Sequence, residues 1–484
     1  MVTPYRWALS DQFLNRTAEL ARLEEWWASK DFRPINVYGR RRTGKSWLLR
    51  RLAHDKPALI VTAERLVPGA QLERFATALE PFLGLRPALP DVPAFFRALF
   101  QAARGAKLLV IVDELPWLLG TSEGEADRQL TAIQAVFEEE RDTSQLKLVL
   151  CGSAVSQMEA LQSERNPLHG RLSPLEIRPL DFSGARLFLD DLDRISQMER
   201  YAVAGGMPLY LSDLAGRDTK TAICKQVLNP HGTLWNEART VLEGELRQPG
   251  VYFSMLEQLA SGDKDIGEIA TPIRIDTATA TKYLLHLADL RLVSRHLPVG
   301  ANPSSRGVHW HLEDPFFRFW FRFVFPFQSE LETGLDPADL YETEVRPALP
   351  EHVSVVFEEW ARSWVRATHG SVVSQVGPWW GHALNLLRQK GERSSEEIDI
   401  VGLARQRVVL VGEVKWTQRK LGVGVLSDLE TYKLPALTQA GLKVAPSPTI
   451  VLISKSGYTD GLVEAAAARR DIELVDVDRA LAGD

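Results

Sequence analysis

The stretch INVYGRRRTGKSWLLRRLAHD, residues 35–55, decides the fold of the first part of the chain. It begins with a short continuous apolar run, typical of a buried strand in a parallel sheet, and it ends with a helical pattern. Between them, GRRRTGKS (39–46) has glycine, glycine, lysine and serine at the positions that a phosphate-binding loop requires. A glycine-rich loop that leaves a strand and opens a helix directs backbone N–H groups at an anion. The stretch therefore predicts a phosphate-binding loop.

The residue types of this loop have separate chemical roles. Gly39 and Gly44 permit the tight turn. Lys45 would reach the outer phosphates, and the Ser46 hydroxyl would ligate Mg²⁺. Thr43 completes the set of loop residues that we expect to contact the nucleotide. The expected cofactors are ATP and Mg²⁺.

Further apolar runs follow the loop, namely ALIVTA (58–63), KLLVIVDE (107–114) and LKLVLCGS (146–153). Because helical stretches separate them, residues 1–180 are predicted to form a doubly wound parallel sheet with helices on both faces. Asp113 and Glu114 close one of these strands at its carboxyl end, where such sheets bind ligands. Asp113 is expected to hold Mg²⁺, and Glu114 to orient or deprotonate the attacking water.

Composition bounds the class of protein. A length of 484 residues suggests about three domains. The net charge of -6 and a pI near 6.0 give no global attraction to nucleic acid, so such binding would need a local patch. The two cysteines, Cys151 and Cys224, argue against a disulfide framework and fit a reducing cytosol. No apolar run approaches the roughly 20 residues that span a bilayer, so we expect a cytoplasmic protein without a membrane partner.

The rest of the chain is predicted to hold a helical lid (181–250), a winged helix-turn-helix (251–312), a helical connector (313–352) and a second α/β domain (353–484). The winged helix is predicted from three helical patterns followed by two strand-like pieces around a turn. It carries six acidic and six basic residues, a balance that favours a protein partner slightly over DNA. The aromatic run DPFFRFWFRFVFPF (314–327) is interpreted as a buried helix rather than a base-stacking surface.

A second group of chemical residues lies in EIDIVGLARQRVVLVGEVKW (397–416). Asp399 belongs to one predicted strand, and Glu413 and Lys415 belong to the next. Residues two apart on a strand share a face, so Glu413 and Lys415 can point at the same ion. Carboxylates of Asp399 and Glu413 on Mg²⁺, with a lysine beside them, can polarise a phosphate and activate water. Alternation also puts Glu397 on the side of Asp399. The spacing is that of a metal-dependent nuclease.

Residues 13 to about 215 resemble the archaeal-type ATPase family within the STAND class of AAA+-related P-loop NTPases. The motifs that carry the resemblance, besides the loop, are FLNRTAEL (13–20), LVLCGSAVSQM (148–158), HGRLSPLEIRPL (169–180) and GGMPLYL (205–211). The first implies that Asn15, in place of the usual glycine, and Arg16 lie against the adenine. The others imply Ser153 as a γ-phosphate sensor, Arg171 as an arginine contact and Pro208 beside the nucleotide.

The resemblance extends to the C-terminal part, where this family often carries a nuclease-like domain of the PD-(D/E)xK type with a restriction-endonuclease-like fold. It implies that Glu358, in VVFEEWARSW, is the helical acid of that site. Glu358, Asp399, Glu413 and Lys415 would then form one catalytic group. A surface charge pair is the alternative interpretation of Glu413 and Lys415, and the fold alone does not establish activity.

Three functions remain open at this point. The leading hypothesis is an ATP-dependent switch that controls a metal-dependent nuclease-like effector acting on nucleic acid. The alternative is a nucleotide-gated scaffold or DNA-binding regulator with an inactive nuclease fold, and oligomers are compatible with either. A protein-remodelling ring is less favoured, because no aromatic pore loop can be assigned.

Overall fold

The computed structural model describes residues 14–120, 122–140, 142–246, 249–302, 307–390 and 393–483. The chain divides into two compact units. Unit 1 comprises Met1–Leu180 with Met207–Leu209, and unit 2 comprises Asp181–Gly206 with Tyr210–Asp484. Among the described residues, no helix is both long enough and apolar enough to cross a membrane.

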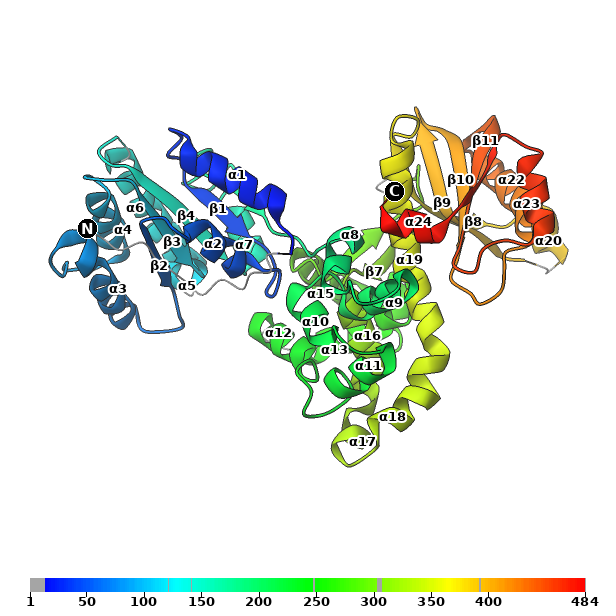
Figure 1. Ribbon diagram of the computed structural model, residues 1–484, viewed down its shortest axis with the longest axis horizontal. Helices are drawn as coiled ribbons and strands as arrows, with labels where there is room; N and C mark the ends of the chain where they lie inside the picture. Colours follow the sequence, from blue (N-terminus) through cyan, green and yellow to red (C-terminus); the bar gives the residue numbers. More distant parts are fainter. Residues whose placement is uncertain are drawn as a thin grey trace. The chain divides into compact units, whose positions relative to one another are not determined.

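Unit 1 is built on a parallel sheet with the strand order β2-β3-β4-β1-β5 (Figure 1). Its strands are β1 (Ile35–Tyr38), β2 (Ala58–Thr62), β3 (Leu108–Asp113), β4 (Leu146–Gly152) and β5 (Ser173–Glu176). The four strands predicted from apolar runs are confirmed. The short β5 was not predicted, and it pairs with β1 at the edge of the sheet.

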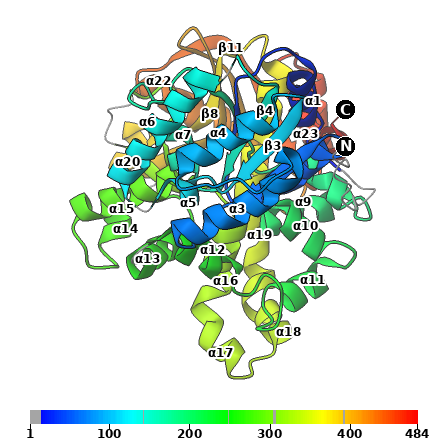
Figure 2. The ribbon, with the colours of Figure 1, turned by 90° about the vertical axis from the view of Figure 1, so that its left-hand side faces the viewer.

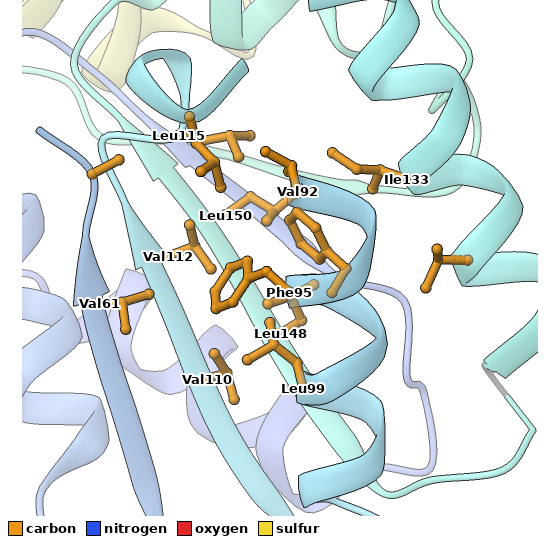
Figure 3. Packing of buried hydrophobic residues seen from close by; sticks show 14 of the residues in the cluster. Val61, Val92, Phe95, Leu99, Val110, Val112, Leu115, Ile133, Leu148 and Leu150 are labelled. Atoms are coloured by element: carbon orange, nitrogen blue, oxygen red, sulfur yellow. The ribbon is translucent and has the colours of Figure 1, made fainter. Parts of the chain in front are cut away.

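Helices cover both faces of this sheet, as predicted. One face packs against α1 (Thr17–Ala28) and α2 (Lys45–Ala53) through alternate strand residues such as Val37 and Ile111. The other face packs against α3 (Pro68–Leu83), α4 (Val92–Ala102) and α6 (Glu123–Glu140), with the short helices α5 (Pro116–Leu119) and α7 (Val155–Ala160) near the strand ends. Figure 3 shows Phe95 and Leu99 of α4 against Val110 and Val112 of β3. The alternation along each strand therefore fills two separate cores.

Unit 2 begins with helices. These are α8 (Phe182–Ala185), η1 (Arg186–Phe188), α9 (Arg194–Ala204), α10 (Pro208–Leu214, whose first two residues belong to unit 1), α11 (Thr219–Gln226), α12 (Glu237–Glu245), α13 (Pro249–Ala260), α14 (Ile266–Ala270), α15 (Thr277–Asp289) and α16 (Pro315–Phe323). Between α15 and α16, an antiparallel pair is formed by β6 (Val293–His296) and β7 (His309–Leu312). The aromatic side chains of α16 are buried, and Trp320 Nε1 donates to the Trp235 carbonyl at 2.7 Å. The interpretation of this run as a buried helix is confirmed.

The long helix α19 (Arg346–His369) leads into the second sheet. It follows η2 (Phe325–Phe327), α17 (Gln328–Glu332), α18 (Pro337–Leu340) and η3 (Tyr341–Val345). Figures 1 and 2 both show α17 and α18 at the end of α19 that is remote from this sheet. The other end of α19 contacts β8, β9 and β10.

The second sheet is mixed, with the order β12-β11-β10-β9-β8. Its strands are β8 (Gln375–His382), β9 (Ser395–Ala404), β10 (Arg407–Lys415), β11 (Lys443–Ser454) and β12 (Ile472–Val475). β8, β9 and β10 are antiparallel, while β10, β11 and β12 are parallel. The accompanying helices are α20 (Asn385–Lys390), α21 (Val423–Asp428), η4 (Leu429–Lys433), α22 (Leu434–Gln439), α23 (Asp460–Ala467) and α24 (Val477–Ala482). Apolar residues of α21, η4, α22 and α23 fill the core on one face.

Candidate functional sites

The predicted phosphate loop lies at the carboxyl end of β1 and opens α2. Position 39 excludes any residue with a side chain, because a Cβ there would lie 2.1 Å from the carbonyl oxygen of Ile177, just after β5. Gly44 is the N-cap of α2 with φ 91°, a left-handed conformation that favours glycine. Both glycines are therefore required by the path of the loop.

Lys45 lies folded over its own loop. Its Nζ donates to the carbonyl oxygens of Gly39 at 2.6 Å and Arg40 at 2.9 Å. The side chain is buried, and burial lowers the pKa of Lys45. The ammonium is thus held at the loop by neutral carbonyls, which a phosphate can replace with a stronger, charged partner.

Arg16 and Thr43 stabilise the loop by donating hydrogen bonds to its backbone carbonyls. Arg16 is buried at the start of α1, and its Nη2 donates to the carbonyls of Thr43 at 3.0 Å and Arg178 at 2.5 Å. The Thr43 hydroxyl donates to the Arg40 carbonyl at 2.9 Å. Asn15 Oδ1 accepts from the Arg16 backbone N–H at 2.5 Å. The structure therefore places Arg16 on the loop backbone, and Arg178 is a loop neighbour that sequence reasoning missed.

Two carboxylates face the loop from the end of β3. Asp113 Oδ2 accepts from the Ser46 hydroxyl at 3.3 Å, so the two predicted Mg²⁺ ligands lie together. Their hard oxygen atoms are the donors that Mg²⁺ prefers, and the pair fits that ion. Glu114, with φ 55°, accepts from the Ser153 backbone N–H at 3.2 Å and from its hydroxyl at 3.0 Å. Ser153 thus holds the predicted water-orienting carboxylate in place.

The remaining two predicted residues have different positions. Pro208, at the start of α10, lies beside the loop, since its Cγ would be 3.8 Å from a Cβ on Gly44. Arg171 precedes β5 at the amino end of the sheet, because Ser173 pairs with Ile35 at the start of β1. Its guanidinium binds Glu138 Oε1 at 2.7 Å. The structure therefore brings Pro208 to the loop and does not bring Arg171 there.

The C-terminal residues predicted from the strand pattern converge on one lysine. Lys415 Nζ lies 3.0 Å from Asp399 Oδ2 and 3.0 Å from Glu413 Oε2. The same Asp399 oxygen accepts from the Val414 backbone N–H at 2.8 Å. The register of β8 against β9 shifts between Gly377 and Trp379, opposite the segment that carries Asp399. A register shift of this kind changes the direction of a neighbouring side chain. Here the Asp399 carboxylate contacts β10.

Helical residues complete this cluster. Glu358 of α19 accepts from the Ser354 hydroxyl at 3.1 Å, and Arg362 Nη1 lies 4.0 Å from its other carboxylate oxygen. Lys433, at the end of η4, donates to Glu413 Oε1 at 2.7 Å. Sequence reasoning missed Lys433, because helical phase alone does not place a single lysine of η4 over a strand. The structure thus brings Glu358 close to the strand residues and adds two further cations, namely Arg362 and Lys433.

The electrostatics of the cluster reflect crowded carboxylates. Burial and the charge of Asp399 raise the pKa of Glu358 to about 8 and also raise the pKa of Glu413. Burial lowers the pKa of Lys415, but Asp399 and Glu413 outweigh it, so the pKa is raised. Burial and Asp399 raise the pKa of Glu397. Because Asp399 and Glu413 aim at one cationic centre with hard oxygen atoms, the pair fits Mg²⁺.

Comparisons with known proteins agree with the architecture of unit 1. Residues 13–214 match a family described as an ATPase domain predominantly from Archaea. Residues 320–426 match a family described as archaeal and bacterial proteins of unknown function. A curated relative from Methanocaldococcus jannaschii, named "Uncharacterized protein MJECL04", is 26% identical over 416 residues, or 84% of this chain and 88% of that protein.

Two solved structures align with much of the chain. The Walker-type ATPase PABY2304 of Pyrococcus abyssi has a TM-score of 0.48 and 17% identity, covering 64% of this chain and 96% of its own. The Aeropyrum pernix ORC1 protein in complex with DNA has a TM-score of 0.32 and 17% identity, covering 67% and 96%. The family match, together with the loop geometry, supports an ATPase domain over residues 13–214.

Proposed function

We propose that unit 1 binds and hydrolyses ATP with Mg²⁺. The observation that carries this proposal is the loop itself, in which Lys45 Nζ donates to the Gly39 carbonyl and the Ser46 hydroxyl donates to Asp113 at the end of β3. Lys45 would exchange its two carbonyl partners for the outer phosphates, and the loop N–H groups would bind the same anion. When bound, Mg²⁺ neutralises charge that develops on the phosphates.

Glu114 is assigned to the attacking water. Its carboxylate is held by two donors of Ser153 on the neighbouring strand end, so its position is fixed relative to the loop. In this arrangement Glu114 orients the water and accepts its proton. Ser153 then serves first as a positioning residue, and its predicted contact with the γ-phosphate would require it to share its hydroxyl.

We propose that the C-terminal cluster is a metal-dependent nuclease-like site acting on nucleic acid. The supporting observation is the pair of carboxylates, Asp399 and Glu413, each 3.0 Å from Lys415 Nζ, with Glu358 beside them. Asp399 and Glu413 would hold Mg²⁺, which polarises the scissile phosphate when bound. Lys415 would move to the phosphate and stabilise its developing negative charge.

We propose that residues 251–312 form a winged helix that binds a protein or nucleic-acid partner, because α13, α14 and α15 are followed by the antiparallel pair β6-β7. The whole chain would then act as an ATP-dependent switch in which nucleotide state controls the C-terminal site. The alternative is a nucleotide-gated scaffold or DNA-binding regulator whose nuclease-like site is inactive. The direct ion pairs of Lys415 and Lys433 with Glu413 support this alternative, because Mg²⁺ must displace both lysines from Glu413 in order to bind it.

The test supplies circular DNA, linear DNA and RNA with Mg²⁺ or Mn²⁺, with and without ATP. Asp399→Ala and Lys415→Ala should abolish cleavage and leave ATP hydrolysis unchanged, while Lys45→Ala should abolish hydrolysis. Lys420→Ala, an exposed lysine in the same unit as Lys415, is the matched control and should cleave normally. Hydrolysis without cleavage under every condition would support the scaffold alternative.

A further inference from the structure

A second cluster of chemical residues in unit 2 lies around the β6-β7 pair. It consists of Asp263, between α13 and α14, and two histidines, His296 of β6 and His311 of β7. The Nδ1 atom of His311 lies 2.5 Å from Asp263 Oδ1, and that of His296 lies 3.2 Å from Asp263 Oδ2. Both imidazoles thus turn the same nitrogen toward one carboxylate, and the three donor atoms lie within 4.8 Å of one another.

From this geometry we infer that Asp263, His296 and His311 form a binding site for a divalent transition metal ion of the Zn²⁺ class. Imidazole nitrogen and carboxylate oxygen are ligands that Zn²⁺ takes at about 2.0–2.2 Å, and three such protein ligands leave one position for water. Tetrahedral bonds of that length separate donor atoms by about 3.3 Å. The 3.2 Å and 2.5 Å distances run to different oxygens of Asp263, and the two imidazole rings are stacked with their centroids 4.3 Å apart. Binding of one ion would therefore require the two rings to rotate apart, so that both Nδ1 atoms and one Asp263 oxygen point to the same position.

The far side of each imidazole supports the assignment. His311 Nε2 lies 2.8 Å from Glu359 Oε1, and His296 Nε2 lies 3.8 Å from Glu313 Oε1. Metal-binding histidines commonly donate their other N–H to a carboxylate, which fixes the tautomer and the ring orientation. His311 therefore has a carboxylate within hydrogen-bond distance of the nitrogen that a metal would leave free, and His296 has one nearby at 3.8 Å.

Arg318 contacts the same nitrogen of His311 as Glu359 does, so the hydrogen bonds of all three residues depend on the tautomer of His311. Its Nη2 lies 2.7 Å from His311 Nε2 and 3.4 Å from Glu359 Oε1. Nε2 cannot accept from Arg318 and donate to Glu359 at the same time. A metal on Nδ1 leaves the proton on Nε2, so His311 would donate to Glu359 and Arg318 would keep its bond to the Leu312 carbonyl at 2.6 Å.

The charges around the cluster also accommodate a divalent ion. Asp263, Glu313 and Glu359 supply negative charge, and Arg318 supplies one positive charge. A divalent ion bound to neutral imidazoles gives the same total as two protonated imidazoles. The metal can therefore replace two protons without leaving an unbalanced buried charge. It would tie the turn after α13 to both strands of the hairpin.

The experiment is a titration of the metal-stripped full chain with Zn²⁺ by calorimetry and with Co²⁺ by visible absorption. In excess Mg²⁺, which fills the proposed carboxylate sites, we expect one Zn²⁺ or Co²⁺ ion per chain with a Kd of about 1 µM or below. Asp263→Asn, His296→Ala and His311→Ala should each weaken binding by at least about 100-fold, and Glu313→Gln by about 10-fold. Asp263→Asn and His296→Ala, at the more exposed positions, keep the test valid if His311→Ala does not fold.

Two controls separate this site from others. His309→Ala removes a histidine of the same strand whose ring stacks on Trp380 at 4.7 Å, and it should bind as the wild type does. Asp399→Ala should also retain the ion, because it belongs to the proposed nuclease-like site. The inference is independent of that site's activity. No Zn²⁺ binding by the wild type, or binding that survives both Asp263→Asn and His296→Ala, would overturn it.

Discussion

The two proposed catalytic sites each use a lysine, but in opposite electrostatic settings. Lys45 rests on neutral carbonyls of its own loop, and burial lowers its pKa. Lys415 rests between two carboxylates from two strands, which raise its pKa against the effect of burial. Lys45 can therefore take an anionic phosphate as a new partner, whereas Lys415 already pairs with two carboxylates. Removing each should therefore have different consequences for activity and stability.

The largest effect is expected from Lys45→Ala. Loss of the ammonium should lower ATP hydrolysis by at least about 10²–10³-fold, because it removes preorganised charge at the phosphates. The melting temperature without nucleotide should change little, since the lysine donates its hydrogen bonds to the neutral carbonyls of Gly39 and Arg40. Steady-state phosphate release and thermal melting measure the two quantities. Lys30→Ala, an exposed lysine of unit 1, is the control, and wild-type hydrolysis by Lys45→Ala would refute the assignment of the loop.

Glu114→Gln should separate binding from chemistry at the same loop. The amide can keep a hydrogen bond to Ser153 but accepts no proton, so hydrolysis should fall about 10²-fold while ATP affinity stays within a few-fold. A fluorescent ATP analogue measures affinity alongside phosphate release. Equal losses in affinity and turnover would show that Glu114 acts in binding instead.

Gly39→Ala tests whether the loop path depends on backbone contact. The added Cβ would lie 2.1 Å from the Ile177 carbonyl oxygen, so β5 or the loop must shift. We expect a loss of about 1–3 kcal/mol in the free energy of unfolding, measured by denaturant titration. Gly105→Ala, where no atom lies within 4 Å of the added Cβ, is the matched control and should change stability far less.

Lys415→Ala should show the contrast in stability. It leaves Asp399 and Glu413 without their shared partner, but the lysine side chain is 36% exposed, so the expected loss is only about 1–2 kcal/mol. Mg²⁺ should restore more stability to this variant than to the wild type, because the ion takes the vacant position between the carboxylates. Thermal melting with and without Mg²⁺ measures this, and an equal Mg²⁺ shift in both proteins would argue against a metal there.

The smallest effect is expected from Arg171→Ala. Its ion pair with Glu138 lies at the surface and should contribute less than about 1 kcal/mol. Its place at the amino end of the sheet predicts unchanged ATP affinity in the isolated chain. Nucleotide titration of the variant is the measurement. A loss of affinity above about 10-fold would reinstate the nucleotide contact that the sequence implied.

The sequence predicted what depends on contiguous residues. The loop was readable because its glycines, lysine and serine are local, and strands β1 to β4 were readable from their apolar runs. β5 (SPLE) and β12 (IELV) have no continuous apolar run, and β8 contains Pro378 and two glycines, which weaken a strand pattern. Strand alternation placed Glu413 and Lys415 on one face of β10.

What the sequence did not reveal depends on the path of the chain between elements. Lys433 reaches Glu413 from η4, and no local pattern fixes that contact. Arg178 meets Arg16 because β5 ends beside the loop, and Arg171 lies at the opposite end of the same strand. The position of β5, which was not predicted, therefore decided the location of both arginines.

The central claim is that nucleotide state governs the C-terminal cluster, and cleavage of DNA and RNA tests it most directly. Wild type, Lys45→Ala and Asp399→Ala would be compared with Mg²⁺, in the presence and absence of ATP. We predict cleavage by the wild type that changes with ATP, cleavage by Lys45→Ala that does not respond to ATP, and none by Asp399→Ala. Cleavage that Asp399→Ala retains, or that responds to ATP in Lys45→Ala, would contradict the account.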